Sequence, residues 1–281
     1  MRTERGSASF LAAAGKGMAV VLILLWSLFP IAFIVLSSFK PGRDIFAMPP
    51  RWVFTPTLAH YATLWRQWGV FFQGLLNSTV ITAGATVLAV LASTGAGYVY
   101  SRHTSRLLDG SVLFLIVVRL IPPIVVTLPL FPIANALGLN DTHGLLVVLY
   151  ATFFVSLGTI LMRTFIDQVP RELDEAATVD GARGLTTLAR IIVPLAMPGI
   201  LAVAVFVVVF SWNEFLFAFI FTGTRTKTTP LVISEMIGSI DGVDWGVLFA
   251  ASAVQLAPVL LFVVFMNRYL VAGLIAGSTK G

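Results

Sequence analysis

Polar side chains stand inside otherwise apolar stretches of this 281-residue chain. Arg119 precedes the sequence Leu-Ile-Pro-Pro, Asn213 and Glu214 follow Trp212, and Gln255 lies in the last apolar stretch. An ionisable group inside a membrane is costly and by default indicates a functional site. Hydrogen-bonding side chains at such positions can also contact a polar solute. We therefore predict a translocation path lined by Arg119, Trp212, Asn213, Glu214 and Gln255.

Two other interpretations of these residues remain open from the sequence. Arg119 and Glu214 can form an internal ion pair that satisfies both charges and fixes the packing of their helices. The same two residues can instead act as a proton relay in a stand-alone ion-coupled secondary transporter. The three interpretations differ in what the charges face: solute, each other, or a proton pathway.

The residue types exclude most enzymatic chemistry. The chain has no cysteine, which excludes disulfides, thiolate metal sites and Cys nucleophiles. A phosphate-binding P-loop needs Gly, four residues and Gly-Lys-Ser/Thr, and "GLIAGSTKG" has its glycines and lysine in the wrong order. His60, His103 and His143 fall in expected loops without carboxylate partners. We therefore predict no catalytic residue, no metal site and no bound cofactor, so that any ATP-driven motor has to be another chain.

The composition is that of an integral membrane protein. Hydrophobic residues make up 58% of the chain and charged residues only 11%, whereas a soluble domain carries about 25% charged residues. The net charge of +5 comes with no basic run, so it does not indicate a nucleic-acid partner. A spanning helix needs roughly 20 mainly apolar residues. Six windows qualify and predict an all-α fold of six transmembrane helices, at 18–36, 79–100, 110–131, 144–162, 196–221 and 246–267.

The distribution of positive charges predicts an orientation. Six spans place both termini on one side, together with the loops 101–109 and 163–195. That side carries eleven Lys and Arg residues and the other side carries six. Because cytoplasmic loops are enriched in Lys and Arg, we predict that both termini are cytoplasmic.

The loop 163–195 holds nine charged residues between two apolar windows. Its first half places Leu173, Ala176, Ala177 and Asp180 on one face of a helix, and Gly181 and Gly184 bracket a break before a second short helix. A hairpin with a small-residue seam and an acidic rim suits either a docking surface or a loop that lies on the membrane, and the periodicity alone does not decide between them.

The segment "EAATVDGARGLTTLARIIVP" resembles the EAA loop of permease subunits from binding-protein-dependent ABC importers. Glu175, Ala176, Ala177, Gly181 and Pro194 fit the spacing of that motif, and Val193 stands where Leu is usual. The similarity extends to the maltose-type second permeases through "SSFKPGRDIFAMPPRW", "NSTVITAGATVLAVLASTGAGYVYSR", "SWNEFLFAFIFTG" and "YLVAGLIAGSTKG", which occur in the order of that family.

The resemblance implies a type I ABC importer permease fold and an ATP-driven import function. The chain 1–281 would be a single permease domain in a bacterial inner membrane, in contact with lipid, with a sugar or polyol as its solute. Its partners would be a second permease subunit, two ATPase subunits that use ATP and Mg, and an extracytoplasmic solute-binding protein. The hairpin would be the coupling helix that docks on an ATPase, through Glu175, Ala176, Ala177, Asp180, Gly181, Ala182 and Pro194. The C-terminal tail, with Gly277, Ser278, Thr279 and Lys280, would also contact the ATPases.

Overall fold

The computed structural model of the chain describes residues 3–239 and 242–278, and in these residues it is all-helical. The chain divides into two compact units, which we describe separately. Unit one comprises the described residues of Met1–Gly69 and Met236–Val254. Unit two comprises those of Val70–Glu235 and Gln255–Gly281. The all-α class predicted from the sequence is confirmed.

Unit one is built around α1 (Thr3–Ser38), α2 (Gly42–Ile45), α3 (Ala59–Gln67) and the first part of α14 (Trp245–Ser278). The short helix α3 lies in the connection 37–78 between the first two apolar windows. None of the residues in the most apolar window of α1 is buried. A helix that is apolar all round and unburied is suited to contact with lipid or with a partner helix.

Unit two contains α4 (Gly69–Arg102), α5 (Arg106–Leu120), α6 (Pro123–Ala136), α7 (His143–Ile166), α11 (Met197–Trp212), α12 (Leu216–Phe221), most of α13 (Thr229–Ile237) and the second part of α14. The core is a cluster contributed mainly by α4, α7 and α11, which includes Ile81, Leu146, Phe154, Val203 and Val207. Small residues allow these helices to approach. A Cβ added at Gly158 of α7 would collide with Ser93 of α4 and come within 3.2 Å of Val203 of α11.

Within the described residues, four helices are long and apolar enough to cross a membrane: Gly15–Ser38 in α1, α4, α7 and Trp245–Met266 in α14. Two helix pairs also qualify if each bent pair is counted as one span, which gives up to six. The first pair is α5 and α6, which meet at 92° across Ile121 and Pro122. A residue before proline avoids the α conformation and proline lacks an N–H donor, so Pro122 and Pro123 account for the break.

The window 196–221 differs from a continuous helix. The helix α11 ends at Trp212, and α12 begins only at Leu216. The second bent pair joins the segment Gly184–Leu195 to α11 at 81°. The helical direction therefore changes beside Ala196, and the helix is interrupted a second time at Asn213.

Candidate functional site

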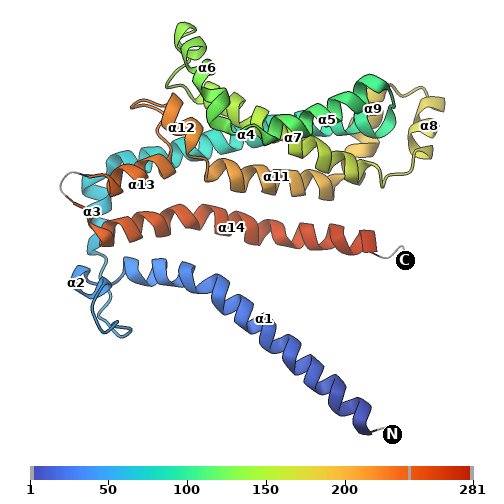
Figure 1. Ribbon diagram of the computed structural model, residues 1–281. Helices are drawn as coiled ribbons and strands as arrows, with labels where there is room; N and C mark the ends of the chain where they lie inside the picture. Colours follow the sequence, from blue (N-terminus) through green and yellow to red (C-terminus); the bar gives the residue numbers. More distant parts are fainter. Residues whose placement is uncertain (1–2, 240–241, 279–281) are drawn as a thin grey trace. The chain divides into compact units, whose positions relative to one another are not determined.

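The loop between α7 and α11 folds as a hairpin whose first arm is α8 (Glu172–Val179). Its second arm consists of α9 (Gly184–Thr187), the π-helical turn η1 (Leu188–Ile192) and α10 (Val193–Leu195). Figure 1 shows α8 at the end of unit two where α4 and α7 finish, whereas α12 lies toward the opposite end. We call residues 172–195 the hairpin.

A glycine-dependent cap ends α8. The N–H of Ala182 donates to the carbonyl of Ala177 at 2.8 Å, and the N–H of Gly181 donates to that of Thr178 at 3.0 Å. This pair of bonds is a Schellman motif, which needs a left-handed residue after the helix. Gly181 occupies that position with φ of +80°. The break predicted at Gly181 is therefore a defined turn.

The two faces of α8 differ in burial. Ala177 is buried against the rest of unit two, at 5% exposure. Glu175, Ala176, Val179 and Asp180 are exposed, and the Glu175 carboxylate has no hydrogen-bond partner among the described residues. Val179 is 88% exposed, and Leu185 on the second arm is 81% exposed. The hairpin thus presents an apolar and acidic surface that the described residues do not cover.

The second arm of the hairpin leads into α11. Ala182 is half-buried at the turn, and Pro194 is exposed in α10, at a first-turn position where a missing N–H costs nothing. The N–H of Ala196 donates to the carbonyl of Ile192 at 2.7 Å, at the point where the helical direction changes. The hairpin is therefore continuous in backbone hydrogen bonding with α11.

An ion pair that our sequence analysis missed fixes the start of α8. Asp174 accepts hydrogen bonds from the hydroxyl of Tyr98 at 2.8 Å and from Nε of Arg102 at 2.9 Å. Arg102 also donates to the backbone carbonyls of Ile166 and Val169, at 3.3 and 2.9 Å. The only sequence signal for this cluster was an arginine at the end of an apolar window. We call Tyr98, Arg102 and Asp174 the clamp.

The residues predicted to line a translocation path separate into two places. Trp212 is buried, and its Nε1 donates to the backbone carbonyl of Gln255 at 3.0 Å, so these two residues do come together. Asn213 follows at the end of α11, exposed, with its amide donating to the carbonyl of Val209 at 2.7 Å. Trp212 therefore joins α11 to α14, and Asn213 is the more accessible of the two.

The Glu214 carboxylate caps α12. It accepts hydrogen bonds from the backbone N–H groups of Phe217 and Ala218, at 2.9 and 3.3 Å. These donors are among the first N–H groups of a helix, which have no partner within the helix. The carboxylate therefore satisfies two backbone donors at the start of α12, directly after the break that separates it from α11.

Arg119 lies near the end of α5, apart from Glu214. Its guanidinium lies 5.1 Å from the ring centroid of Phe153 and 5.8 Å from that of Phe206, and it donates to the carbonyl of Phe153 at 3.3 Å. None of the five ion pairs in the described part of the chain involves Arg119 or Glu214. The alternative of an internal Arg119–Glu214 pair is therefore wrong; cation–π contacts accommodate the arginine instead.

Arg119 borders a cavity of about 430 Å³ between α5, α6, α7 and α12. Its lining is largely apolar and includes Phe114, Leu130, Phe153 and Phe217, with Thr152 and Ser156 as polar groups. Ile121 and Pro123, from the bend between α5 and α6, are also among the lining residues. Arg119 is the one charged residue among the described residues that line this cavity.

The opposite end of unit two carries a hydrogen-bonded network. Asp141, with φ of +58°, accepts from the hydroxyl and N–H of Thr226 at 2.7 and 2.9 Å and from the N–H of Arg225 at 3.1 Å. Burial alone would raise the pKa of the Asp141 carboxyl, but these hydrogen bonds, with one from Gly223, lower the pKa well below its ordinary value. His143 bonds to Asn77 at 2.8 Å and so contributes to the same network.

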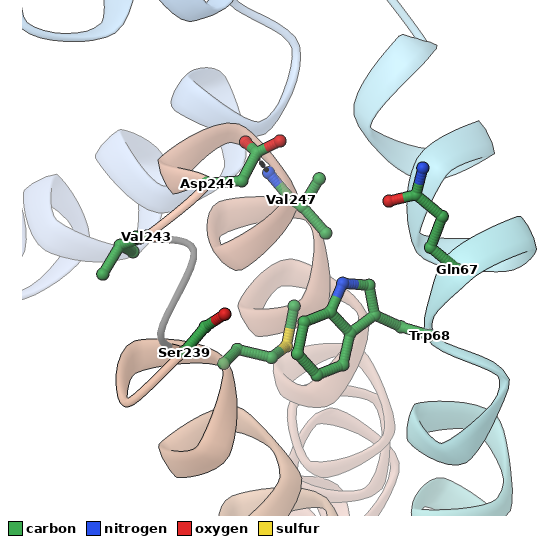
Figure 2. A pocket seen from close by; sticks show the side chains of 8 residues that line it. Gln67, Trp68, Ser239, Val243, Asp244 and Val247 are labelled. Atoms are coloured by element: carbon green, nitrogen blue, oxygen red, sulfur yellow. Dashed lines mark hydrogen bonds between the residues drawn. The ribbon is translucent and has the colours of Figure 1, made fainter.

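Unit one contains a separate pocket of about 400 Å³. Figure 2 shows Trp68 and Gln67 from the end of α3 facing Asp244 and Val247 from the start of α14. The Asp244 carboxylate accepts the N–H of Val247 at 3.1 Å, which caps α14. An indole beside amide and carboxylate groups makes this pocket more polar than the cavity beside Arg119.

The predicted tail contacts fall at the edge of the described chain. Gly277 and Ser278 are the last residues of α14, whereas Thr279 and Lys280 lie outside the described residues. The described residues contain no group of three or more His, Cys, Asp or Glu side chains arranged to hold a metal ion.

Similarities to known proteins agree with this architecture. Residues 85–275 match the family described as "binding-protein-dependent transport system inner membrane component". The chain is 38% identical over 256 residues to a probable ABC transporter permease protein of Sinorhizobium fredii, covering 90% of each chain. It is 33% identical over 268 residues to the trehalose transport system permease protein SugB of Mycobacterium tuberculosis, covering 92% of this chain and 95% of that one.

A third relative is the trehalose/maltose transport system permease protein MalG of Thermococcus litoralis, 31% identical over 268 residues, with 94% and 95% coverage. The fold resembles a chain of a bacterial ABC transporter involved in alginate import, with a TM-score of 0.77, 18% identity and 93% and 97% coverage. These relatives are transport components and not enzymes, and a stand-alone ion-coupled carrier is not supported. The chain is a multi-pass inner-membrane protein that belongs to the family of permease subunits of binding-protein-dependent ABC importers.

Proposed function

We propose that this chain is the permease subunit of an ATP-driven importer for a sugar or a related polyol, with residues 1–281 as one permease domain. The named relatives that transport trehalose and maltose support this solute class. The excess of Lys and Arg in the loops on the side of the termini supports a cytoplasmic location of both termini and of the hairpin.

The hairpin is the docking element for an ATPase subunit in this proposal. One observation carries it: the exposed α8 face with Glu175, Ala176, Val179 and Asp180 has no partner surface among the described residues of this chain, although α8 itself is firmly anchored. Small side chains at such a face allow a partner to approach closely, and Glu175 is available for polar contacts. ATP and Mg would be bound by the ATPase chains and not by this one.

The remaining partners follow from the family. A second permease subunit would complete the transmembrane pathway, two ATPase subunits would drive it, and a soluble binding protein would deliver the solute. The solved alginate transporter is described in complex with an alginate pentasaccharide-bound periplasmic protein, which supports the last of these. ATP-driven closure of the ATPases would move the hairpins and switch the access of the pathway.

Asn213 is the residue that we assign to the solute pathway first. Trp212 is buried and bonded to α14, and the Glu214 carboxylate caps α12. The Asn213 side chain also bonds within the chain, to the carbonyl of Val209, but it is exposed at the break between α11 and α12. A helix break frees backbone polar groups, and in membrane proteins such breaks are tolerated where they line a cavity or are buried in protein. Gln255 lies next to this break through its bond with Trp212, and Arg119 borders a separate cavity.

The test is a charge reversal at Glu175 in the complex purified with its partners. Glu175→Lys should leave the chain in the membrane and reduce recovery of the ATPase and solute uptake by about tenfold or more, because the polar contacts of the carboxylate are lost and a partner group that suits a carboxylate would face a cation. Asp109→Lys is the matched control, since Asp109 is an exposed acidic residue on the same predicted side but outside the hairpin. Normal ATPase recovery and uptake with Glu175→Lys would disprove docking through this face.

A further inference from the structure

The clamp connects three helices at the end of unit two that carries the hairpin. Arg102 is the last residue of α4, Tyr98 lies one turn before it, and Asp174 is in the first turn of α8. Both side-chain bonds to Asp174 are shorter than 3.0 Å. The start of α8 is thus bonded to the end of α4 by two side chains on one face of that helix.

The guanidinium of Arg102 reaches a third element. Its Nη1 and Nη2 donate to the carbonyls of Ile166 and Val169, which end α7 and start the connection to α8. Arg171 makes a reciprocal bond, from Nη2 to the carbonyl of Ser101, at 2.8 Å. Only arginine offers donors in a fork that can serve a carboxylate and two carbonyls at once.

The clamp differs in burial from the other ion pairs of the described chain. The side chains of Arg102 and Asp174 are 7% and 18% exposed. In each of the other four pairs at least one side chain is more than 40% exposed. Exposed pairs contribute little to stability, whereas a buried pair that loses one partner leaves an uncompensated charge. The geometry of the clamp is therefore strongly fixed.

Next to the clamp, α4 and α7 are in close contact. A Cβ added at Gly97 would lie 2.7 Å from Cβ of Met162 and 3.0 Å from the backbone N of Arg163. The two helices therefore touch one turn before Arg102. A displacement of α8 cannot be absorbed between α8 and α7, because Arg102 bonds to both.

We infer that Arg102 is a positioning residue that transmits the displacement of α8 to α4 through Asp174. This inference rests on the proposed function, in which an ATPase subunit docks on α8. The clamp is the side-chain link from the first arm of the hairpin to both α4 and α7, beside the bond from Arg171 to Ser101. Docking and transmission are then carried by different residues: Glu175 and its exposed neighbours on one face of α8, the clamp on the other.

The experiment uses the complete complex reconstituted in liposomes and measures both ATP hydrolysis and solute uptake. Arg102→Ala and Asp174→Asn should retain the bound ATPase and its hydrolysis, while the solute moved per ATP falls about tenfold. The solute moved per ATP should fall less in Arg102→Lys, because an ammonium group can still reach Asp174 but cannot donate to both carbonyls. Arg163→Ala is the matched control, since it removes the exposed Arg163–Asp167 pair and should leave the ratio unchanged.

A spectroscopic readout separates transmission from simple loss of fold. The chain has no cysteine, so spin labels can be placed at Leu91→Cys on α4 and Glu172→Cys on α8, both exposed positions. The distribution of distances between the two labels should be narrow with and without ATP in the otherwise wild-type chain. The distribution should broaden in Asp174→Asn. If Arg102→Ala is not recovered from membranes, Asp174→Asn carries the test, because it is nearly isosteric.

The outcomes distinguish the two proposals. If Glu175→Lys leaves ATPase binding intact, the proposed docking face is wrong. If Glu175→Lys abolishes binding but the clamp variants transport normally per ATP with unchanged label distances, docking stands and the inference about Arg102 is overturned.

Discussion

The indole Nε1 of Trp212 donates a 3.0 Å hydrogen bond to the backbone carbonyl of Gln255, so the last residue of α11 is tied to α14. This bond lies directly beside the break at Asn213. It gives Trp212 a structural task at a place where the sequence predicted a contact with solute. Separate variants can distinguish these two roles.

Trp212→Phe removes the donor and retains an aromatic ring. We expect it to destabilise the detergent-solubilised chain by about 1 kcal/mol, the usual net contribution of one hydrogen bond. The solute concentration for half-maximal uptake should stay unchanged. Thermal unfolding and uptake assays measure the two effects; a large rise in that concentration at unchanged stability would instead place the indole on the solute.

Glu214→Ala should destabilise the chain by about 1 kcal/mol, because the N–H groups of Phe217 and Ala218 lose their cap. Glu214→Gln should cost less, since an amide oxygen can still accept one of these bonds, and it should retain ATP-driven uptake. The measurement is uptake at matched protein recovery. Abolished uptake in a normally stable Glu214→Gln variant would show that the charge itself takes part in transport.

Gly181→Ala should loosen the turn of the hairpin, because a left-handed conformation costs a residue with a side chain about 1–2 kcal/mol. ATPase binding and uptake should both fall. Gly184→Ala is the matched control: its added Cβ would meet nothing within 4 Å, and its φ is not left-handed. Equal behaviour of the two variants would contradict the assigned role of Gly181.

Asp141 should make the stability of the chain depend on pH at the acidic end. Its folded pKa lies below the ordinary value of about 4. The stabilisation is therefore complete above that ordinary value and is lost as the pH falls toward the folded pKa. Asp141→Asn keeps a side chain that tolerates positive φ and removes the charge. Between pH 6 and about pH 3, the free energy of unfolding should fall more steeply with decreasing pH in the wild type than in this variant. Parallel pH dependences in the two proteins would contradict the assignment.

The predictable parts of the molecule are those set by local sequence. Long apolar runs predict membrane helices, and Pro122 and Pro123 predict the bend between α5 and α6 because proline acts on its own backbone. Gly181 predicts the turn of the hairpin for the same kind of reason. The break at Asn213 carries no such signal, since "SWNEFLF" contains neither proline nor glycine; it depends on the cap from Glu214 and the bond from Trp212.

Contacts between distant segments were not predictable. Arg102 and Asp174 are 72 residues apart, and nothing in either segment specifies the other. Arg119 illustrates the same limit, since the sequence offered Glu214 as its partner and the fold supplies the rings of Phe153 and Phe206. Apolar spans predict that a polar group needs a partner, but only the packing of the helices determines which one.

The most direct test of the central claim is solute uptake by the complex purified with its partners and reconstituted in liposomes, with ATP and the binding protein varied independently. We predict accumulation of a sugar or polyol only when both are present, and its loss in Glu175→Lys. Accumulation by this chain alone, without ATP and driven by an ion gradient, would contradict the account.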